Sequence, residues 1–388
     1  MKSETASLPL DQTRRVSYAE YALIAVILIV ATKFCTLPSV LSGVAESKAV
    51  WVILLLLVLE YVILFFATKT AKCGGLPLLE IKRGIKVPLL FLFALFFALK
   101  LAAFSREIST YYALSLFENA PVLPITVLLL IACALLAKKG FMGIGRVTEI
   151  FVWLFLFVFL FVLIFTRTEG DLFNALAIFN PDFTGMGKGV WQGLAWFGDS
   201  AVVAFLDLRG EDVLAPQLSG AFDPQRSKAK RRIILAVLLV TFFLSALFYA
   251  VFIAVYGDAA KMTDYAFIKL SAFKANTDEL GSADWPVIIL WAILSALYLS
   301  LLFLGGKECL SGIAPSKEDQ KQKTVPSFCL SAAVALTISF LFLDEEGDYE
   351  SFMTRVMNVV TLLAAAATIG VGIYALCRLK GGRDEEQD

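Results

Sequence analysis

The sequence predicts an all-α integral membrane protein of ten transmembrane helices, in two inverted halves of five, with the first and sixth helices broken. Apolar residues make up 59% of the 388-residue chain and the mean hydropathy is +0.78, whereas a soluble domain is usually about half apolar. Apolar runs of about 20 residues, the length that crosses a bilayer, recur along the chain. Residues that disrupt a helix interrupt the first and sixth of these runs, which lie in corresponding positions of the two halves.

The ten expected spans define one membrane domain over residues 19–379, preceded by a tail at 1–18 and followed by a tail at 380–388. Lysine and arginine gather in alternate segments such as "TKTAKCGGLPLLEIKRGIK" and "DPQRSKAKRR", whereas "LDEEGDYESF" on the opposite side is acidic. By the positive-inside rule, both tails of this multi-pass membrane protein are cytoplasmic. The spans cover residues 19–41, 49–67, 86–117, 122–138, 146–166, 187–208, 231–256, 284–306, 325–343 and 354–379.

The first span contains the stretch "IVATKFCTLPSVL", in which a lysine and a proline interrupt the apolar run. Lys33 lies near mid-depth, where a charged side chain is costly unless it faces a cavity or a partner. Pro38 removes a backbone donor and clashes with the preceding turn. Together they predict a broken helix. The alternative is an ordinary proline kink, with Lys33 reaching outward along the helix surface.

The sixth span contains "WQGLAWFGDSAVVAFLDL", where Gly193 and Gly198 weaken the helix and Asp199 and Ser200 follow directly. We expect a second break here, and we expect Lys33 and Asp199 to approach within ion-pair distance. The alternative for this span is a glycine packing contact, with the aspartate facing a neighbouring helix. Helices broken near mid-depth offer free helix ends and unpaired backbone groups to a small ligand.

The third span adds a polar stripe, because Lys100, Glu107 and Tyr111 recur at helical spacing on one face. Such a stripe favours a cavity lining. Two alternatives remain open. Lys100 could pair with Asp199 in place of Lys33, and Arg106 with Glu107 could form ion pairs that join helices without contacting a ligand.

Other chemistry finds little support. The chain has no histidine, and no metal-ligand cluster or nucleophile–base pair appears, so neither an enzyme, nor a cofactor, nor a metal site is expected. Nucleic acid is not an expected partner. The outer segment 257–284 places Tyr265, Ile268, Leu270 and Phe273 near helical spacing. This spacing predicts a short amphipathic helix, which could be a lid or a surface helix.

Four stretches resemble the spore germination permeases, the multi-spanning B subunits of GerA-type germinant receptors in the amino acid–polyamine–organocation superfamily. These stretches are "FCTLPSVLSGVAESKAVWV", "LFENAPVLPITVLLLIACALLAKKGFMGIGRVTEIF", "GLAWFGDSAVVAFL" and "ANTDELGSADWPVIILWAILSALYLS". The second stretch contains the Arg-x-x-Glu pattern of Arg146 and Glu149. The chain departs from the family at Lys33, where a small residue is more usual, and at Asp199, so a charged ligand is possible.

The resemblance implies a LeuT-like fold with an amino-acid-sized pocket between spans 1, 3, 6 and 8. It also implies a role as a germinant-sensing subunit in the spore inner membrane, working with a larger membrane subunit and a lipoprotein. The alternative is a secondary transporter of amino acids or polyamines. Pro38, Arg146 and Glu149 are expected to be structural. The expected ligand-binding residues are Thr32, Lys33, Phe34, Cys35, Thr36, Lys100, Phe104, Glu107, Phe197, Gly198, Asp199, Ser200 and Ser295.

Overall fold

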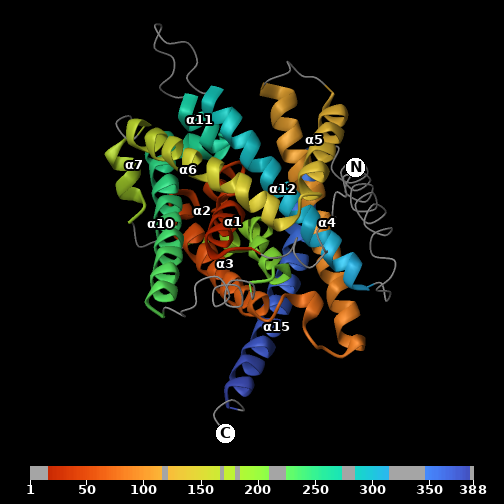
Figure 1. Cartoon of the computed structure of the whole chain (residues 1–388). Helices are drawn as coiled ribbons and strands as arrows, with labels where there is room; N and C mark the ends of the chain where they lie inside the picture. The colour runs from red at the N-terminus through yellow and green to blue at the C-terminus, as the bar shows by residue number, and fades with distance from the viewer. Residues whose placement is uncertain are drawn as a thin grey trace, which may run out of the picture.

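The computed structural model describes residues 16–115, 121–166, 170–179, 184–208, 224–272, 285–313 and 346–384. Every regular element within these ranges is helical. Figure 1 shows α1 (Tyr18–Val30) and α2 (Leu37–Ala45) in the middle of the molecule, with longer helices around them. The other α-helices are α3 (Ala49–Lys72), α4 (Arg83–Ser115), α5 (Val122–Ala137), α6 (Gly140–Thr166), α7 (Leu172–Ala177), α8 (Met186–Gly193), α10 (Pro224–Tyr256), α11 (Ala266–Ala272), α12 (Trp285–Ile313), α14 (Glu346–Ser351) and α15 (Asn358–Asp384).

Short helices of other types connect these elements. The 3-10 helices are η2 (Glu46–Lys48), η3 (Leu76–Leu78), η5 (Leu194–Trp196), η6 (Asp199–Phe205) and η7 (Gly257–Met262). A π-helical turn, η8 (Phe352–Met357), leads into α15.

Six helical stretches of the described residues are long and apolar enough to cross a membrane, and α1 and α5 are shorter apolar helices. The chain is therefore an all-helical, multi-pass membrane protein. The ninth expected span, 325–343, lies outside the described residues. The six stretches are Leu37–Lys72, Arg83–Ala113, Gly140–Ile164, Leu235–Met262, Pro286–Ile313 and Tyr349–Leu379.

The helix α1 lies at the centre of the protein core. Every side chain from Tyr21 to Val30 is buried, as expected for a helix that is apolar on all sides. It begins with a capping box, in which the Ser17 hydroxyl accepts from Glu20 N while the Glu20 carboxylate accepts from Ser17 N. α1 contacts α6, α10, α12 and η6, so the residues that follow it emerge deep inside the protein.

Among the described residues, α4 and α12 form the most extensive helix pair. Phe104 meets Tyr298 at 5.7 Å between ring centroids, and Tyr111 meets Trp291 at 5.2 Å. Since residue numbers rise along one helix as they fall along the other, the pair is antiparallel. A Cβ atom on Gly305 would lie only 2.8 Å from the Phe97 ring, so this glycine permits the close approach. The pair forms a wall, and its α12 also contacts α1.

Candidate functional site

The first span is broken, as predicted. α1 ends at Val30, residues 31–36 form turns, and α2 begins at Leu37. Pro38 lies in the first turn of α2, where its missing N–H is no loss because the first four N–H groups of a helix have no partner within it. The proline therefore starts a new helix and does not kink a continuous one. The alternative of a kinked helix with Lys33 reaching outward is wrong, because the Lys33 side chain is only 1% exposed.

The sixth span is broken at Phe197 and Gly198. Phe197 is extended after η5, and Gly198 has a φ of +83° before η6. This left-handed conformation favours glycine. A Cβ atom at Gly198 would also lie 3.1 Å from the Thr361 methyl group on α15. The two breaks meet in the protein core, where Phe197, Asp199 and Ser200 are fully buried.

A buried cluster of charges joins the two breaks. Asp199 pairs through one carboxylate oxygen with Lys33 and through the other with Lys100. The predicted contact between Lys33 and Asp199 is confirmed, and Lys100 shares the same carboxylate instead of replacing Lys33. The Tyr298 hydroxyl also contacts Asp199 Oδ1, at 3.1 Å.

Backbone carbonyls complete the environment of both ammonium groups. Lys33 Nζ donates to Leu28 O at 2.8 Å, near the end of α1, and Lys100 Nζ donates to Phe197 O at 2.6 Å. Aromatic rings line the cluster, because Lys33 lies 5.3 Å from the Phe197 centroid and Lys100 lies 5.4 Å from that of Phe104. Each charge is thus paired, hydrogen-bonded and shielded from lipid, as a buried charge requires.

Glu60 supplies a second carboxylate that the sequence analysis missed. It lies on α3, is fully buried, and accepts from Gly198 N at 2.5 Å and Ser200 N at 2.8 Å. The Ser200 hydroxyl donates to it at 2.6 Å. Two of the N–H groups at the start of η6, those of Gly198 and Ser200, are thereby satisfied. The rule that pointed to Lys33, a charge in the middle of an apolar run, applies equally to "LLLVLEYVILFF".

A separate polar cluster surrounds Glu107, which lies seven residues, or about two helical turns, after Lys100 on α4. Glu107 Oε1 accepts from the Thr36 hydroxyl at 2.6 Å, and Oε2 accepts from the Tyr349 hydroxyl at 2.9 Å. The Tyr265 hydroxyl donates to the Glu107 carbonyl at 3.3 Å. The Thr36 and Tyr349 hydroxyls are both neutral donors to this carboxylate. Ion pairs of Arg106 and Glu107 that join helices stay a prediction.

The segment that begins α11 is hydrogen-bonded to the first break. Ala266 N donates to Cys35 O and Phe267 N donates to Phe34 O, both at 3.0 Å. The predicted helix is present as α11, and Ile268 and Leu270 of its expected apolar face are buried. Phe273 lies outside the described residues. Because the segment bonds directly to unwound backbone, it is more than a helix resting on the surface.

The remaining expected ligand-binding residues are all buried. Thr32 and Ser295 are buried in the same region, and the Ser295 hydroxyl has no hydrogen-bond partner among the described residues. Phe34 turns away from the charges, since its ring packs 4.5 Å from Phe248 and 4.9 Å from Phe159.

Cys35 is buried, and its thiol lies 3.8 Å from Ala31 O. Arg146 and Glu149 are exposed on α6, and Arg146 contacts Met142 Sδ at 3.9 Å. A structural role for these two residues therefore stays a prediction.

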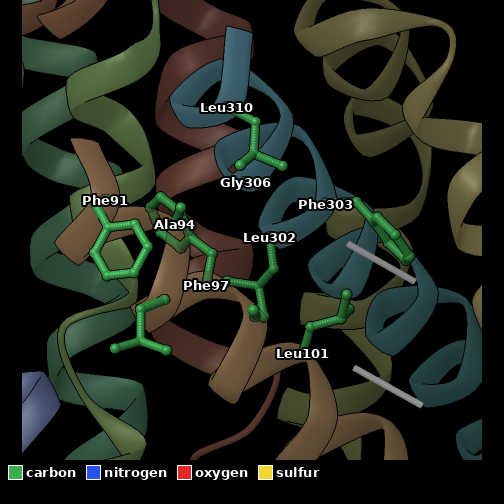
Figure 2. Close-up of a pocket in the computed structure, with 10 residues that line it drawn as sticks. Phe91, Ala94, Phe97, Leu101, Leu302, Phe303, Gly306 and Leu310 are labelled. Atoms are coloured by element: carbon green, nitrogen blue, oxygen red, sulfur yellow. The ribbon is translucent and has the colours of Figure 1, made fainter. Parts of the chain in front are cut away.

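No group of three or more histidine, cysteine, aspartate or glutamate side chains that could hold a metal occurs in the described ranges. A hollow of about 280 Å³ does lie between α4 and α12, but it is apolar and does not suit a polar ligand. Figure 2 shows this hollow, and none of the expected ligand-binding residues lines it. Its lining residues are Phe91, Ala94, Leu95, Phe97, Ala98, Leu101, Leu302, Phe303, Gly306 and Leu310.

Comparison with solved structures identifies the fold. A crystal structure of the Eremococcus coleocola manganese transporter, in complex with an aromatic bis-isothiourea substituted compound, matches with a TM-score of 0.57 and 15% identity. The match covers 92% of this chain and 78% of that chain. The chain has a transporter fold. A histidine-to-alanine mutant of the same transporter matches with a TM-score of 0.56 and 14% identity, over the same shares of both chains.

No protein-family model matches the chain, and no curated protein matches its sequence. At 14–15% identity the transporter likeness shows the fold alone.

Proposed function

We propose that this chain is a secondary transporter that binds a small organic solute, of amino-acid size, beside the breaks in spans 1 and 6. The observation that carries the proposal is the meeting of two broken helices at a fully buried cluster of charges within a transporter fold. In transporters with broken helices, the breaks meet near mid-depth and form the site of the solute that crosses the membrane.

The solute would bind between the first break and the α4–α12 wall. Trp291 and Tyr298 both pack against α4, and Ser295 lies about one turn from each, so it faces α4 near Glu107. Its unpartnered buried hydroxyl is a group that a polar ligand would satisfy. A carboxylate has about four acceptor positions, so Glu107 can accept from a solute amine in addition to Thr36 and Tyr349.

A divalent metal ion fits this chain poorly. Both oxygens of Asp199 are occupied by ammonium groups, and the Glu60 carboxylate is engaged by Ser200 and the Gly198 backbone. Two lysine charges in one buried cluster would also repel a metal cation. The manganese in the name of the similar transporter is therefore not part of the function proposed for this chain.

The finer architecture is part of the same proposal. We infer ten spans in two inverted halves over residues 19–379, with cytoplasmic tails at 1–18 and 380–388. The supporting observations are the two breaks five spans apart and the basic segments that fall on one side of the predicted membrane.

A second candidate function is solute sensing by a germinant receptor subunit in the spore inner membrane. It is favoured by the four stretches that resemble spore germination permeases, including "GLAWFGDSAVVAFL" at the second break. In this role the solute would bias one arrangement of the helices, and the larger membrane subunit and the lipoprotein would respond to it.

A thermal-shift screen of the purified protein tests the shared claim of solute binding. Amino acids, polyamines, sugars and nucleosides would be added singly, and a solute that binds only the folded state must raise the melting temperature. We expect at least one small organic solute to do so, and Glu107→Gln to remove the shift. A null result with every organic solute, alongside a shift with Mn²⁺, would reject the proposal.

A further inference from the structure

We propose that the ammonium groups of Lys33 and Lys100 occupy a cation-binding centre formed by the two breaks. The protein would then need no free cation at this centre, and shortening Lys100 would convert the centre into a site for a monovalent cation such as Na⁺. This inference concerns the breaks themselves and does not depend on which solute the protein binds.

The oxygen atoms around Lys100 Nζ are those expected of a small cation site. They are the Phe197 carbonyl at 2.6 Å and Asp199 Oδ1, with the Tyr298 hydroxyl bound to that same carboxylate oxygen at 3.1 Å. All three residues, Phe197, Asp199 and Tyr298, are fully buried. A carboxylate, a carbonyl and a hydroxyl oxygen are ligands that hard cations prefer.

Lys33 Nζ makes a matching set of contacts on the other oxygen of Asp199. It also donates to Leu28 O at 2.8 Å, in the last turn of α1. The last carbonyls of a helix lack donors within the helix and carry partial negative charge. In transporters with broken helices, such free carbonyls coordinate Na⁺. Here two side-chain cations already hold them.

The charge balance explains why a free cation would be excluded. The cluster holds two ammonium groups, Lys33 and Lys100, and two carboxylates, Asp199 and Glu60, which joins it through Gly198 and Ser200. With all four groups ionised, these charges cancel. A further cation would add an unpaired charge to a buried site, which is strongly unfavourable. Removing one lysine leaves a net negative charge and, for a short replacement, an empty space.

Two substitutions at Lys100 distinguish the effect of removing its charge from the effect of opening space in the site. Lys100→Ala removes the ammonium group and opens room beside Phe197 O, Asp199 and Tyr298. Lys100→Met removes the same charge but fills nearly the same volume. Lys188→Ala, at an exposed position on α8, controls for the loss of a lysine elsewhere.

The test compares melting temperatures of the full-length purified proteins in NaCl and in choline chloride at equal ionic strength, without solute. We expect Na⁺ to raise the melting temperature of Lys100→Ala by about 3 °C at a concentration well above its dissociation constant. The wild type, Lys100→Met and Lys188→Ala should show no difference between the two salts.

Each outcome decides the matter. A sodium-specific rise confined to Lys100→Ala, or a variant that remains folded only in sodium, supports the proposal. A sodium-specific rise in the wild type overturns it, because the centre would then take a free cation with both lysines present. Equal melting temperatures in both salts for Lys100→Ala would also overturn it, because the space and the net negative charge would then not bind Na⁺. None of these results depends on solute binding, so a failure here is distinct from a failure of the proposed function.

Discussion

Glu60 shows how much a single buried residue contributes at the centre of this protein. Its carboxylate accepts from two backbone N–H groups and one hydroxyl of the second break, and it balances one of the two lysine charges. Each of these donors would otherwise be buried without a partner, which is costly in free energy. The break in span 6 therefore depends on a residue of span 2.

We predict that Glu60→Gln lowers the free energy of unfolding by about 2–4 kcal/mol. The amide retains one acceptor oxygen, but its NH₂ group would face the Gly198 or Ser200 donor, and one negative charge is lost from the cluster. Chemical unfolding of the purified variant measures the change. Glu80→Gln is the matched control, because the Glu80 side chain is 80% exposed and pairs with Arg378 at the surface. Equal effects of the two substitutions would contradict the assigned role of Glu60.

Sequence reasoning located most of the central residues but not all of their contacts. A lysine at mid-depth in span 1 and an aspartate beside a glycine in span 6 must each find a partner in lipid, so the Lys33–Asp199 contact could be predicted. That Lys100 shares Asp199 depends on the exact rotation of α4 against the breaks, which hydropathy does not determine. Glu60 was overlooked because no proline or glycine accompanies it in its span.

In the broken elements, some features are encoded by nearby residues in the sequence, whereas others arise only from tertiary packing. Pro38 and Gly198 mark both breaks in the sequence, because each restricts or permits backbone conformations locally. The 3-10 helix at Asp199–Phe205 and the π-helical turn at Phe352–Met357 carry no such mark. The bonds from α11 to the Phe34 and Cys35 carbonyls arise from tertiary packing, and periodicity in the outer segment could predict only that a helix is present.

The Glu107 cluster links four elements, and we predict that Tyr349→Phe weakens this link. The substitution keeps the ring but removes the hydroxyl that donates to Glu107 Oε2 at 2.9 Å. A lost hydrogen bond to a buried carboxylate should lower the free energy of unfolding by about 1–2 kcal/mol. Tyr374→Phe is the control, since it removes a hydroxyl that donates to Glu80 O at the same 2.9 Å in an exposed position. Chemical unfolding of both variants decides, and a larger loss in Tyr374→Phe would contradict the account.

At the scale of the whole molecule, hydropathy predicted an all-helical membrane protein, and the likeness to a transporter bears this out. Neither the hydropathy nor the structural likeness identifies the solute, because proteins of one fold can bind many different ligands. The residues at the breaks decide between the classes of cargo. Two lysines pair with both oxygens of Asp199, so that carboxylate is not free for a divalent metal ion. In the proposed function, Glu107 and Ser295 bond a polar organic molecule instead.

Uptake into proteoliposomes tests the proposed transport of an organic solute most directly. Protein reconstituted alone would be given, in parallel, a labelled solute identified by the thermal-shift screen and labelled Mn²⁺, with protein-free liposomes as the control. We predict that the organic solute enters well above the control and that Mn²⁺ does not. Binding of the solute without entry would favour the sensing role. Uptake of Mn²⁺ with no entry of any organic solute would contradict the central claim.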